Sequence, residues 1–231
     1  MKTQVKQFAT PVTLVGGGAL GPDDLETALA LAPGLIAADG GAGAALSAGY
    51  MPDAVIGDFD SLSHDDRDRI PSERLFPIAE QESTDFDKIM RSVAAPLMLA
   101  VGFLGARVDH QLGAFNTLVR HPGQSCILVG PRELVFHAPP RLALELEPGA
   151  VVSLFPMCRL TGRSQGLEWP IDGLELAPDG RVGTSNRALG AVRIETDAPG
   201  LLVIVPRTAL AAVTRALAPG AVSPAPSPAR A

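Results

Sequence analysis

Short apolar runs alternate with amphipathic stretches over the first 140 residues of the chain. The runs at 12–15 and 35–38 are only four residues long, and their composition is that of buried strands. Between such runs, residues 23–31 and 109–119 place apolar side chains three and four positions apart, which is the spacing of one helix face. Further strands are expected at 97–101 and 127–129, and further helices at 44–48 and directly after Ser83 and Thr84, whose hydroxyls suit N-caps. This alternation predicts an α/β fold with a mainly parallel sheet flanked by helices.

The pattern changes near residue 140. Residues 142–146 and 192–196 alternate between apolar and polar side chains, and glycines and Pro-Gly pairs separate the short segments. Short alternating strands between turn signals indicate an antiparallel β-sandwich. We therefore expect an α/β domain over 1–140 and a β-sandwich domain over 141–217. A tail over 218–231, rich in Ala, Pro and Ser, is expected to be disordered.

Composition narrows the possible functions. The net charge is −6 and no cluster of Lys and Arg occurs, so we expect no nucleic-acid surface. No apolar run approaches the roughly 20 residues that span a bilayer, and no signal-peptide pattern opens the chain. Neither Cys126 nor Cys158 belongs to a C-x-x-C pair, so we expect reduced thiols, no zinc site and a cytoplasmic protein.

Asp58 and Asp60 lie in Gly-Asp-Phe-Asp-Ser, directly after an apolar run. In extended chain, alternate side chains point the same way, so both carboxylates would face one point while Phe59 enters the core. Two carboxylates this close repel each other unless a cation lies between them. The motif therefore predicts a metal site, and the alternative is a polar turn that only ends the strand.

Asp85 begins a predicted helix in Thr-Asp-Phe-Asp-Lys. Its carboxylate would lie near free backbone N–H groups at the positive end of the helix dipole. A plain capping arrangement, with Asp87 three residues after Thr84, explains the same pattern.

A glycine-rich stretch over 102–116 contains Arg107, which could neutralise phosphate charge where glycines let the backbone approach closely. Asp109, Gly113 and Asn116 share one face of the helix that follows. The alternative is a glycine turn before an ordinary amphipathic helix. His110 is expected to be a surface or core histidine and not a ligand.

Two further glycine clusters follow predicted strands. Asp39, Gly40 and Gly41 follow the run at 35–38, and 16–18 is a glycine triplet. No P-loop motif occurs, and the dinucleotide fingerprint is matched only loosely, because Pro22 directly follows Gly21. Ligands bind at the carboxyl ends of parallel strands, which is where these clusters are expected.

Taken in order, these segments resemble thiamine pyrophosphokinase. The resemblance rests on Ala-Asp-Gly-Gly-Ala at 38–42, Pro-Asp-x-x-Ile-Gly-Asp-Phe-Asp-Ser at 52–61, Ser-Thr-Asp-Phe-Asp-Lys at 83–88, Gly-Ala-Arg-Val-Asp-His at 105–110, Asn116, Trp169-Pro170 and Gly-Thr-Ser-Asn at 183–186. It extends from about residue 12 to residue 206. No single segment is specific for this family. The combination is specific, because the segments occur in the family's order and in both halves of the chain.

The resemblance implies that the α/β domain binds ATP and Mg²⁺, that the sandwich helps to bind thiamine, and that the protein is a homodimer with active sites at the subunit interface. It implies a metal site of Asp58, Asp60 and Asp85, and catalytic roles for Asp85, Asp109 and Arg107. It places Asp39, Gly40, Gly41 and Asn116 on the nucleotide side, and Gln81, Trp169, Ser185 and Asn186 on the thiamine side.

The expected activity is diphosphate transfer from ATP to the hydroxyl of thiamine, which gives thiamine diphosphate and AMP. The residues leave the general base open between Asp85 and Asp109. Trp169 offers an aromatic face to the positive thiazolium ring, although a core role is its alternative. A diphosphokinase acting on another hydroxymethyl heterocycle, such as a pterin, and a nucleotide-binding module without turnover are the competing functions.

Overall fold

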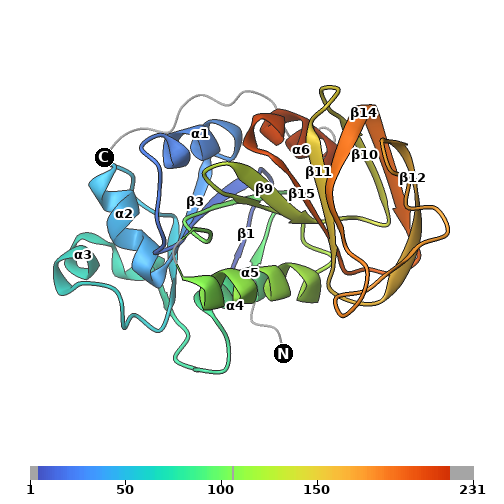
Figure 1. The fold of residues 1–231 in the computed structure, drawn as a ribbon. Helices are drawn as coiled ribbons and strands as arrows, with labels where there is room; N and C mark the ends of the chain where they lie inside the picture. Colours follow the sequence, from blue (N-terminus) through green and yellow to red (C-terminus); the bar gives the residue numbers. More distant parts are fainter. Residues whose placement is uncertain (1–4, 106, 219–231) are drawn as a thin grey trace.

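The computed structural model describes residues 5–105 and 107–218. Figure 1 shows a half in which helices cover strands, next to a half built almost entirely of strands. Of the predicted tail over 218–231, all residues except Ala218 lie outside the described part of the chain.

The first half is a parallel sheet, as predicted. Strands β2 (Val12–Val15), β7 (Met98–Val101) and β8 (Cys126–Val129) pair in parallel in that order. Strands β3 (Gly34–Ala38), β4 (Ala54–Gly57) and β5 (Leu75–Pro77) form a second parallel set, and β3 lies beside β2. Every residue of β2, β4, β7 and β8 is buried, which explains why these strands are continuous apolar runs.

Helices cover the two faces of this sheet (Figure 1). The first-half helices are α1 (Asp24–Leu31), α2 (Ala42–Ser47), α3 (His64–Arg69), α4 (Asp85–Ser92) and α5 (Val108–Arg120). Apolar residues of α1 and α2 belong to one core cluster and those of α4 and α5 to another, and Val15 and Leu14 on β2 divide between the two. Within the described ranges, no helix is long and apolar enough to cross a membrane.

The sheet continues without a break into the second half. Strand β8 pairs antiparallel with β9 (Glu133–His137), β9 with β15 (Leu201–Pro206), and β15 with β11 (Val151–Pro156). Strand β14 (Gly183–Thr196) pairs first with β11 and then with β10 (Arg141–Glu145) and β12 (Leu160–Leu167). This confirms the antiparallel second half, while the division at residue 140 stays a prediction.

The remaining elements are short. They are β1 (Lys6–Gln7), β6 (Val93–Ala94), β13 (Glu175–Leu176), the 3₁₀ turns η1 (Asp39–Gly41), η2 (Ser72–Arg74) and η3 (Arg207–Ala209), and helix α6 (Leu210–Leu217). Helix α6 was not expected from the sequence. It follows β15 and η3 directly, and its apolar residues Leu210 and Val213 pack in the core cluster that contains α1.

Candidate active site at the carboxyl ends of the parallel strands

Asp39, Asp58 and Asp60 bring three carboxylates together, with one oxygen from each lying within 4.8 Å of the others. Asp39 begins η1 directly after β3, and the other two follow β4. Strands β3 and β4 are parallel neighbours, so their carboxyl ends meet at the same edge of the sheet.

The loop after β4 is a tight turn, which corrects the expectation of extended chain. Phe59 has φ 67°, in the left-handed region, and its half-buried ring packs against the core under Arg67. The turn is closed by hydrogen bonds from the Asp60 N–H to Asp58 Oδ1 at 3.4 Å and from Ser61 Oγ to Asp60 Oδ1 at 2.9 Å. The two carboxylates therefore converge because the chain turns, not because alternate residues share a face.

Asp39 is the buried member of this group, with no exposed surface. Its Oδ2 accepts a hydrogen bond from the Ser61 N–H at 3.1 Å, and its Oδ1 has no partner among the described residues. Burial raises the pKa of Asp39 to about 6, and the neighbouring carboxylates add to the rise against the Ser61 hydrogen bond. A Cβ on Gly57 would lie 2.7 Å from Asp39 Cβ, so only glycine lets the strand end approach this closely.

The carboxylate group fits a hard divalent cation. Magnesium holds oxygens at about 2.1 Å, so its ligand atoms lie roughly 3 to 4 Å apart, close to the spacing seen between these side chains. A buried carboxylate oxygen without a hydrogen bond is costly unless something positive meets it. Asp39 was predicted on the nucleotide side, and the structure places its carboxylate next to those of Asp58 and Asp60.

Asp85, the third predicted metal ligand, pairs with a lysine. Thr84 caps α4, as predicted, by accepting the Asp87 N–H, and Asp85 follows in the first turn. Lys88 Nζ donates to Asp85 Oδ1 at 2.9 Å and to Asp58 Oδ2 at 3.1 Å. Gln81 Nε2 also donates to Asp58 Oδ2, at 2.8 Å.

These contacts move the pKa values of the three charged groups. Burial raises the pKa of Asp85, and the Lys88 hydrogen bond only partly offsets the rise. Burial also opposes ionisation of Asp58 and Lys88, but hydrogen bonds prevail: the bond from Lys88 lowers the pKa of Asp58, and the bonds to Asp85 and then Asp58 raise the pKa of Lys88. The sequence analysis did not single out Lys88. The available signal was its position three residues after Asp85 on the predicted helix, a spacing that allows the two side chains to form an ion pair.

A cleft of about 710 Å³ surrounds these groups. Its described lining includes Gly17, Gly18, Gly40, Asp58, Asp60, Ser61, Gln81, Asp85, Lys88, Phe103, Arg107 and His110. His110 therefore lines the cleft, although the sequence analysis expected it to lie outside the site. Gly102 has φ +74°, and a Cβ there would lie 2.6 Å from the Gly16 oxygen, so close approach of the ends of β2 and β7 shapes one wall.

Other predicted residues lie around the cleft. Arg107 lines it and pairs with Asp109 through contacts of 3.1 and 2.5 Å, and both side chains are exposed. The Arg107 hydrogen bond lowers the pKa of Asp109 to about 2. Asn116 is exposed farther along α5, and Gly41 packs with its Cα against the Val15 carbonyl, where a Cβ would lie at 2.1 Å.

Trp169, Ser185 and Asn186 lie in the antiparallel half, and none of them is among the described residues that line the cleft. Trp169 is 54% exposed. Asn186 is buried and holds the Trp169 backbone, because its Oδ1 accepts the Trp169 N–H at 3.1 Å and its Nδ2 donates to the Trp169 oxygen at 2.6 Å. Ser185 has φ 61° and stays exposed.

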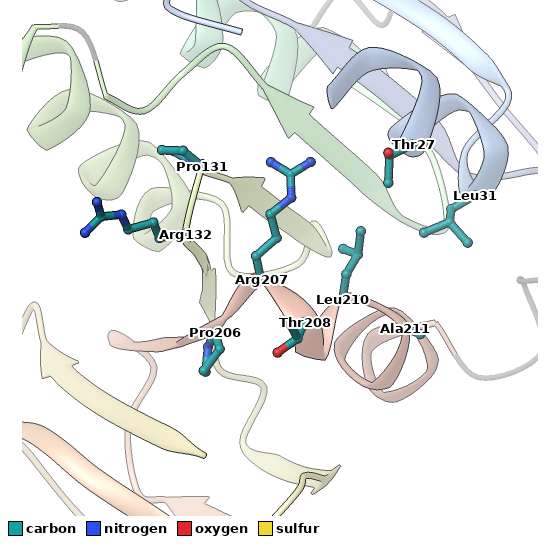
Figure 2. A pocket seen from close by; sticks show the side chains of 9 residues that line it. All are labelled: Thr27, Leu31, Pro131, Arg132, Pro206, Arg207, Thr208, Leu210 and Ala211. Atoms are coloured by element: carbon teal, nitrogen blue, oxygen red, sulfur yellow. The ribbon is translucent and has the colours of Figure 1, made fainter. Parts of the chain in front are cut away.

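A second depression lies on the opposite helical layer, between α1, the β8–β9 turn and η3 (Figure 2). Figure 2 shows Arg207 projecting from the start of η3 toward the α1 side, while Arg132 extends away. Arg207 Nη1 contacts Asp24 Oδ1 at 2.5 Å and donates to the Gly130 oxygen at 3.1 Å. None of the predicted site residues is among the described ones that line this depression. Arg207 has a structural role there, because it connects η3 with α1 and with the β8–β9 turn.

Comparisons with known proteins relate both halves of the chain to one family. Two family models match, described as "Thiamin pyrophosphokinase, catalytic domain" over residues 25–128 and "Thiamin pyrophosphokinase, vitamin B1 binding domain" over 141–201. Thiamine pyrophosphokinase 1 of Arabidopsis thaliana and thiamine pyrophosphokinase 3 of Oryza sativa subsp. japonica are each 27% identical over 156 residues. Each match covers 59% of this chain and 58% of the relative, so the chain aligns with less than two thirds of these relatives' length.

Solved structures share the fold. Thiamin pyrophosphokinase from Candida albicans matches with a TM-score of 0.72 and 16% identity, over 89% of this chain and 94% of that one. A protein from Lactobacillus plantarum matches with a TM-score of 0.73 and 23% identity, over 86% of this chain and 99% of that one. The two family models together match more than half of the sequence, one in each structural half, and the chain belongs to the thiamin pyrophosphokinase family.

Proposed function

We propose that the chain transfers a diphosphate group from ATP to the hydroxyl of thiamine, giving thiamine diphosphate and AMP. The observation that carries this proposal is that Asp58, Asp60, Lys88 and Arg107 line one cleft at the strand ends, with the buried carboxylate of Asp39 directly beside Asp58 and Asp60. The descriptions of the two family models, a catalytic domain and a vitamin B1 binding domain, support the same reaction.

The nucleotide occupies the cleft in this proposal. Gly17, Gly18 and Gly40 line it, and glycines let backbone groups approach phosphates closely. Arg107 adds a cation for the phosphate oxygens. Asp39, Asp58 and Asp60 would hold Mg²⁺, which would supply positive charge to neutralise the triphosphate. In diphosphate transfer most of the rate enhancement comes from such positioning and charge neutralisation.

Asp85 is the better candidate for the general base. The thiamine hydroxyl must lose its proton as its oxygen attacks the β-phosphorus, and a carboxylate with a raised pKa accepts a proton more readily. Burial raises the pKa of Asp85, whereas Arg107 lowers that of Asp109 to about 2. Asp85 also lines the cleft directly. We assign Asp109 the role of orienting Arg107.

We propose that thiamine is held by Gln81 in the cleft and by the exposed Trp169 of a second copy of the chain. Trp169 presents a free aromatic face, and the thiazolium cation would gain roughly 0.5–2 kcal/mol by stacking there. Asn186 would fix the backbone that carries this ring, and Ser185 lies beside it. Since none of the cleft's described lining comes from the antiparallel half, a homodimer would complete the site.

The direct test is AMP release from ATP by the purified chain. We expect AMP and thiamine diphosphate with thiamine and Mg²⁺, and no AMP with EDTA. A hydroxymethyl pterin in place of thiamine should give no more AMP than a reaction without acceptor. Faster release with the pterin would assign the other heterocycle, and no release with either acceptor would leave a nucleotide-binding module. We propose the cytoplasm as the compartment, where the free thiols Cys126 and Cys158 would stay reduced.

A further inference from the structure

Lys88 is an unusual residue because it is a lysine with only 1% of its surface exposed. Lysine is almost never fully buried unless it is paired, since an unpaired ammonium group loses its hydration without compensation. It lies on the inner side of α4 and is one of the residues that line the cleft. Its charge must therefore be balanced by groups in the cleft.

The ammonium group of Lys88 joins two segments that are distant in sequence. It contacts Asp85 on its own helix at 2.9 Å and Asp58, thirty residues earlier in the loop after β4, at 3.1 Å. Asp58 has 14% of its side chain exposed and Asp85 29%, so solvent screens these contacts only partly. The contacts thus hold the start of α4 against the loop that carries the carboxylate group.

The two oxygens of Asp58 have different partners. Its Oδ2 accepts hydrogen bonds from both Lys88 and Gln81, at 3.1 and 2.8 Å. Among the described residues, its Oδ1 accepts only a long contact of 3.4 Å from the Asp60 N–H. Because Oδ2 of Asp58 already accepts two hydrogen bonds, Oδ1 is the oxygen available to bind a cation together with Asp39 and Asp60. Partners that orient a ligating carboxylate in this way commonly change metal affinity by about 10- to 100-fold.

We propose that Lys88 is a positioning residue for divalent-cation binding, which holds Asp58 by Oδ2 and Asp85 by Oδ1 so that the other oxygen of Asp58 faces the cation. Its effect on turnover rests on the proposed function, but its effect on cation binding does not. The ammonium group also fills part of the cleft with positive charge where two carboxylates would otherwise repel each other.

The test is the affinity of the full chain for Mn²⁺, measured by isothermal titration calorimetry without nucleotide. In Lys88→Ala we expect the Mn²⁺ dissociation constant to rise at least tenfold. Because the shortened side chain leaves a cavity beside both carboxylates, ethylammonium at high concentration should restore part of the affinity. Tetramethylammonium, which is too large and has no N–H donor, should not. Lys6→Ala, which removes a lysine that donates to the Asp53 carbonyl and does not line the cleft, should bind Mn²⁺ as the wild type does.

Lys88→Met provides a second variant that keeps the length and packing of the side chain. It should lose Mn²⁺ affinity to a similar extent and should not respond to ethylammonium, because no cavity is left. Mn²⁺ affinity within twofold of wild type in either variant, tighter binding in either, or no Mn²⁺ binding by the wild type would overturn the proposal. If wild type binds Mn²⁺ and the variants lose it while no thiamine turnover occurs, the proposed function fails and the role of Lys88 stands.

Discussion

Asp39 is the residue whose surroundings are least favourable for its charge. Burial raises the pKa of its carboxyl group to about 6 from the ordinary 3.8, so the folded protein resists ionisation there. Without metal, this penalty is absent below pH 3.8 and fully present above about pH 6. We therefore expect Asp39→Asn to raise the free energy of unfolding at pH 8 by about 1–3 kcal/mol, measured by urea titration in EDTA.

The same substitution should abolish stabilisation by Mn²⁺, because the buried oxygen without a hydrogen-bond partner becomes part of an uncharged amide. Asp60→Asn is the matched control. Asp60 is exposed, so we expect its stability in EDTA to change by less than about 0.5 kcal/mol while Mn²⁺ stabilisation is again lost. If Asp39→Asn and Asp60→Asn gain equal stability in EDTA, the gain cannot come from relieving the burial of the Asp39 charge.

At this scale the sequence could predict which side chains converge where one short motif contains them, while their role in metal binding stays a prediction. Asp58 and Asp60 were assigned to one site and lie in it, although a turn at Phe59 brings them together. The resemblance placed Asp39 on the nucleotide side, and its closeness to Asp58 could not be predicted, because that distance depends on the pairing of β3 with β4, which the sequence does not specify. Lys88 was missed because a lysine on a helix is normally solvated, and only the folded chain shows that it is buried.

Individual elements are joined by a few buried polar contacts, and the pair between α1 and η3 is one of them. Asp24 and Arg207 are 9% and 25% exposed, and Arg207 also holds the Gly130 carbonyl (Figure 2). Arg207→Met would leave the Asp24 carboxylate buried without its cation. Breaking a fully buried pair costs about 3–5 kcal/mol, so for this partly exposed one we expect a loss of about 2–3 kcal/mol in urea unfolding.

Arg132→Met is the control for that measurement. Arg132 lies at the edge of the same depression, but its side chain is exposed and extends away from Arg207 (Figure 2). Its replacement should change the free energy of unfolding by less than about 0.5 kcal/mol. Asp24→Asn combined with Arg207→Met should recover part of the loss, because no unpaired charge is then buried. A double variant less stable than Arg207→Met would contradict this account.

The turn before β15 is fixed to β9 by a neutral histidine. His137 Nε2 accepts the Gly200 N–H at 2.9 Å, which an imidazolium nitrogen cannot do, and burial lowers the pKa of His137. A lowered pKa means that stability is full above the ordinary value near 6.5 and is lost as the pH falls through the folded-state value. We expect wild type to lose stability between pH 7.5 and 5 relative to His137→Gln, which keeps an acceptor oxygen without a titrating ring. If the free energy of unfolding changes with pH in the same way in both proteins, titration of His137 does not affect the stability of this turn.

The two helices that the sequence did not predict, α3 and α6, were missed for different physical reasons. Helix α3 buries none of its residues, so it has no apolar face to detect, and its start depends on Ser63 accepting the Asp66 N–H. Helix α6 has an apolar face, but it is only eight residues long and only the three residues of η3 separate it from the buried strand β15, so no turn signal marks it as a separate element. The strands β2 and β7 were found because their apolar runs are bounded by glycines and polar residues.

On the scale of the whole molecule, the chain has a continuous sheet but two separate sets of candidate functional residues. The hydrogen-bonded path runs from β7 through β9 and β15 to β14, so the two halves are parts of one framework. The cleft nevertheless takes its described lining from the parallel half alone, while Trp169 lies exposed in the antiparallel half. The sequence could predict both sets from their motifs, but not whether one chain or two would join them, because that depends on a surface between copies.

Mixed dimers test whether two copies share a site. If Asp60 of one copy acts with Trp169 of the other, dimers of Asp60→Asn alone and dimers of Trp169→Ala alone each contain no intact site. After the two are unfolded together and refolded in equal amounts, half of the dimers contain one of each, and each of these has one intact site, so about one quarter of wild-type activity should return. The measurement is AMP release with thiamine, with separately refolded variants mixed just before assay as the control. Activity no higher than that control would mean that Asp60 and Trp169 serve the same copy, and a composite site would then be excluded.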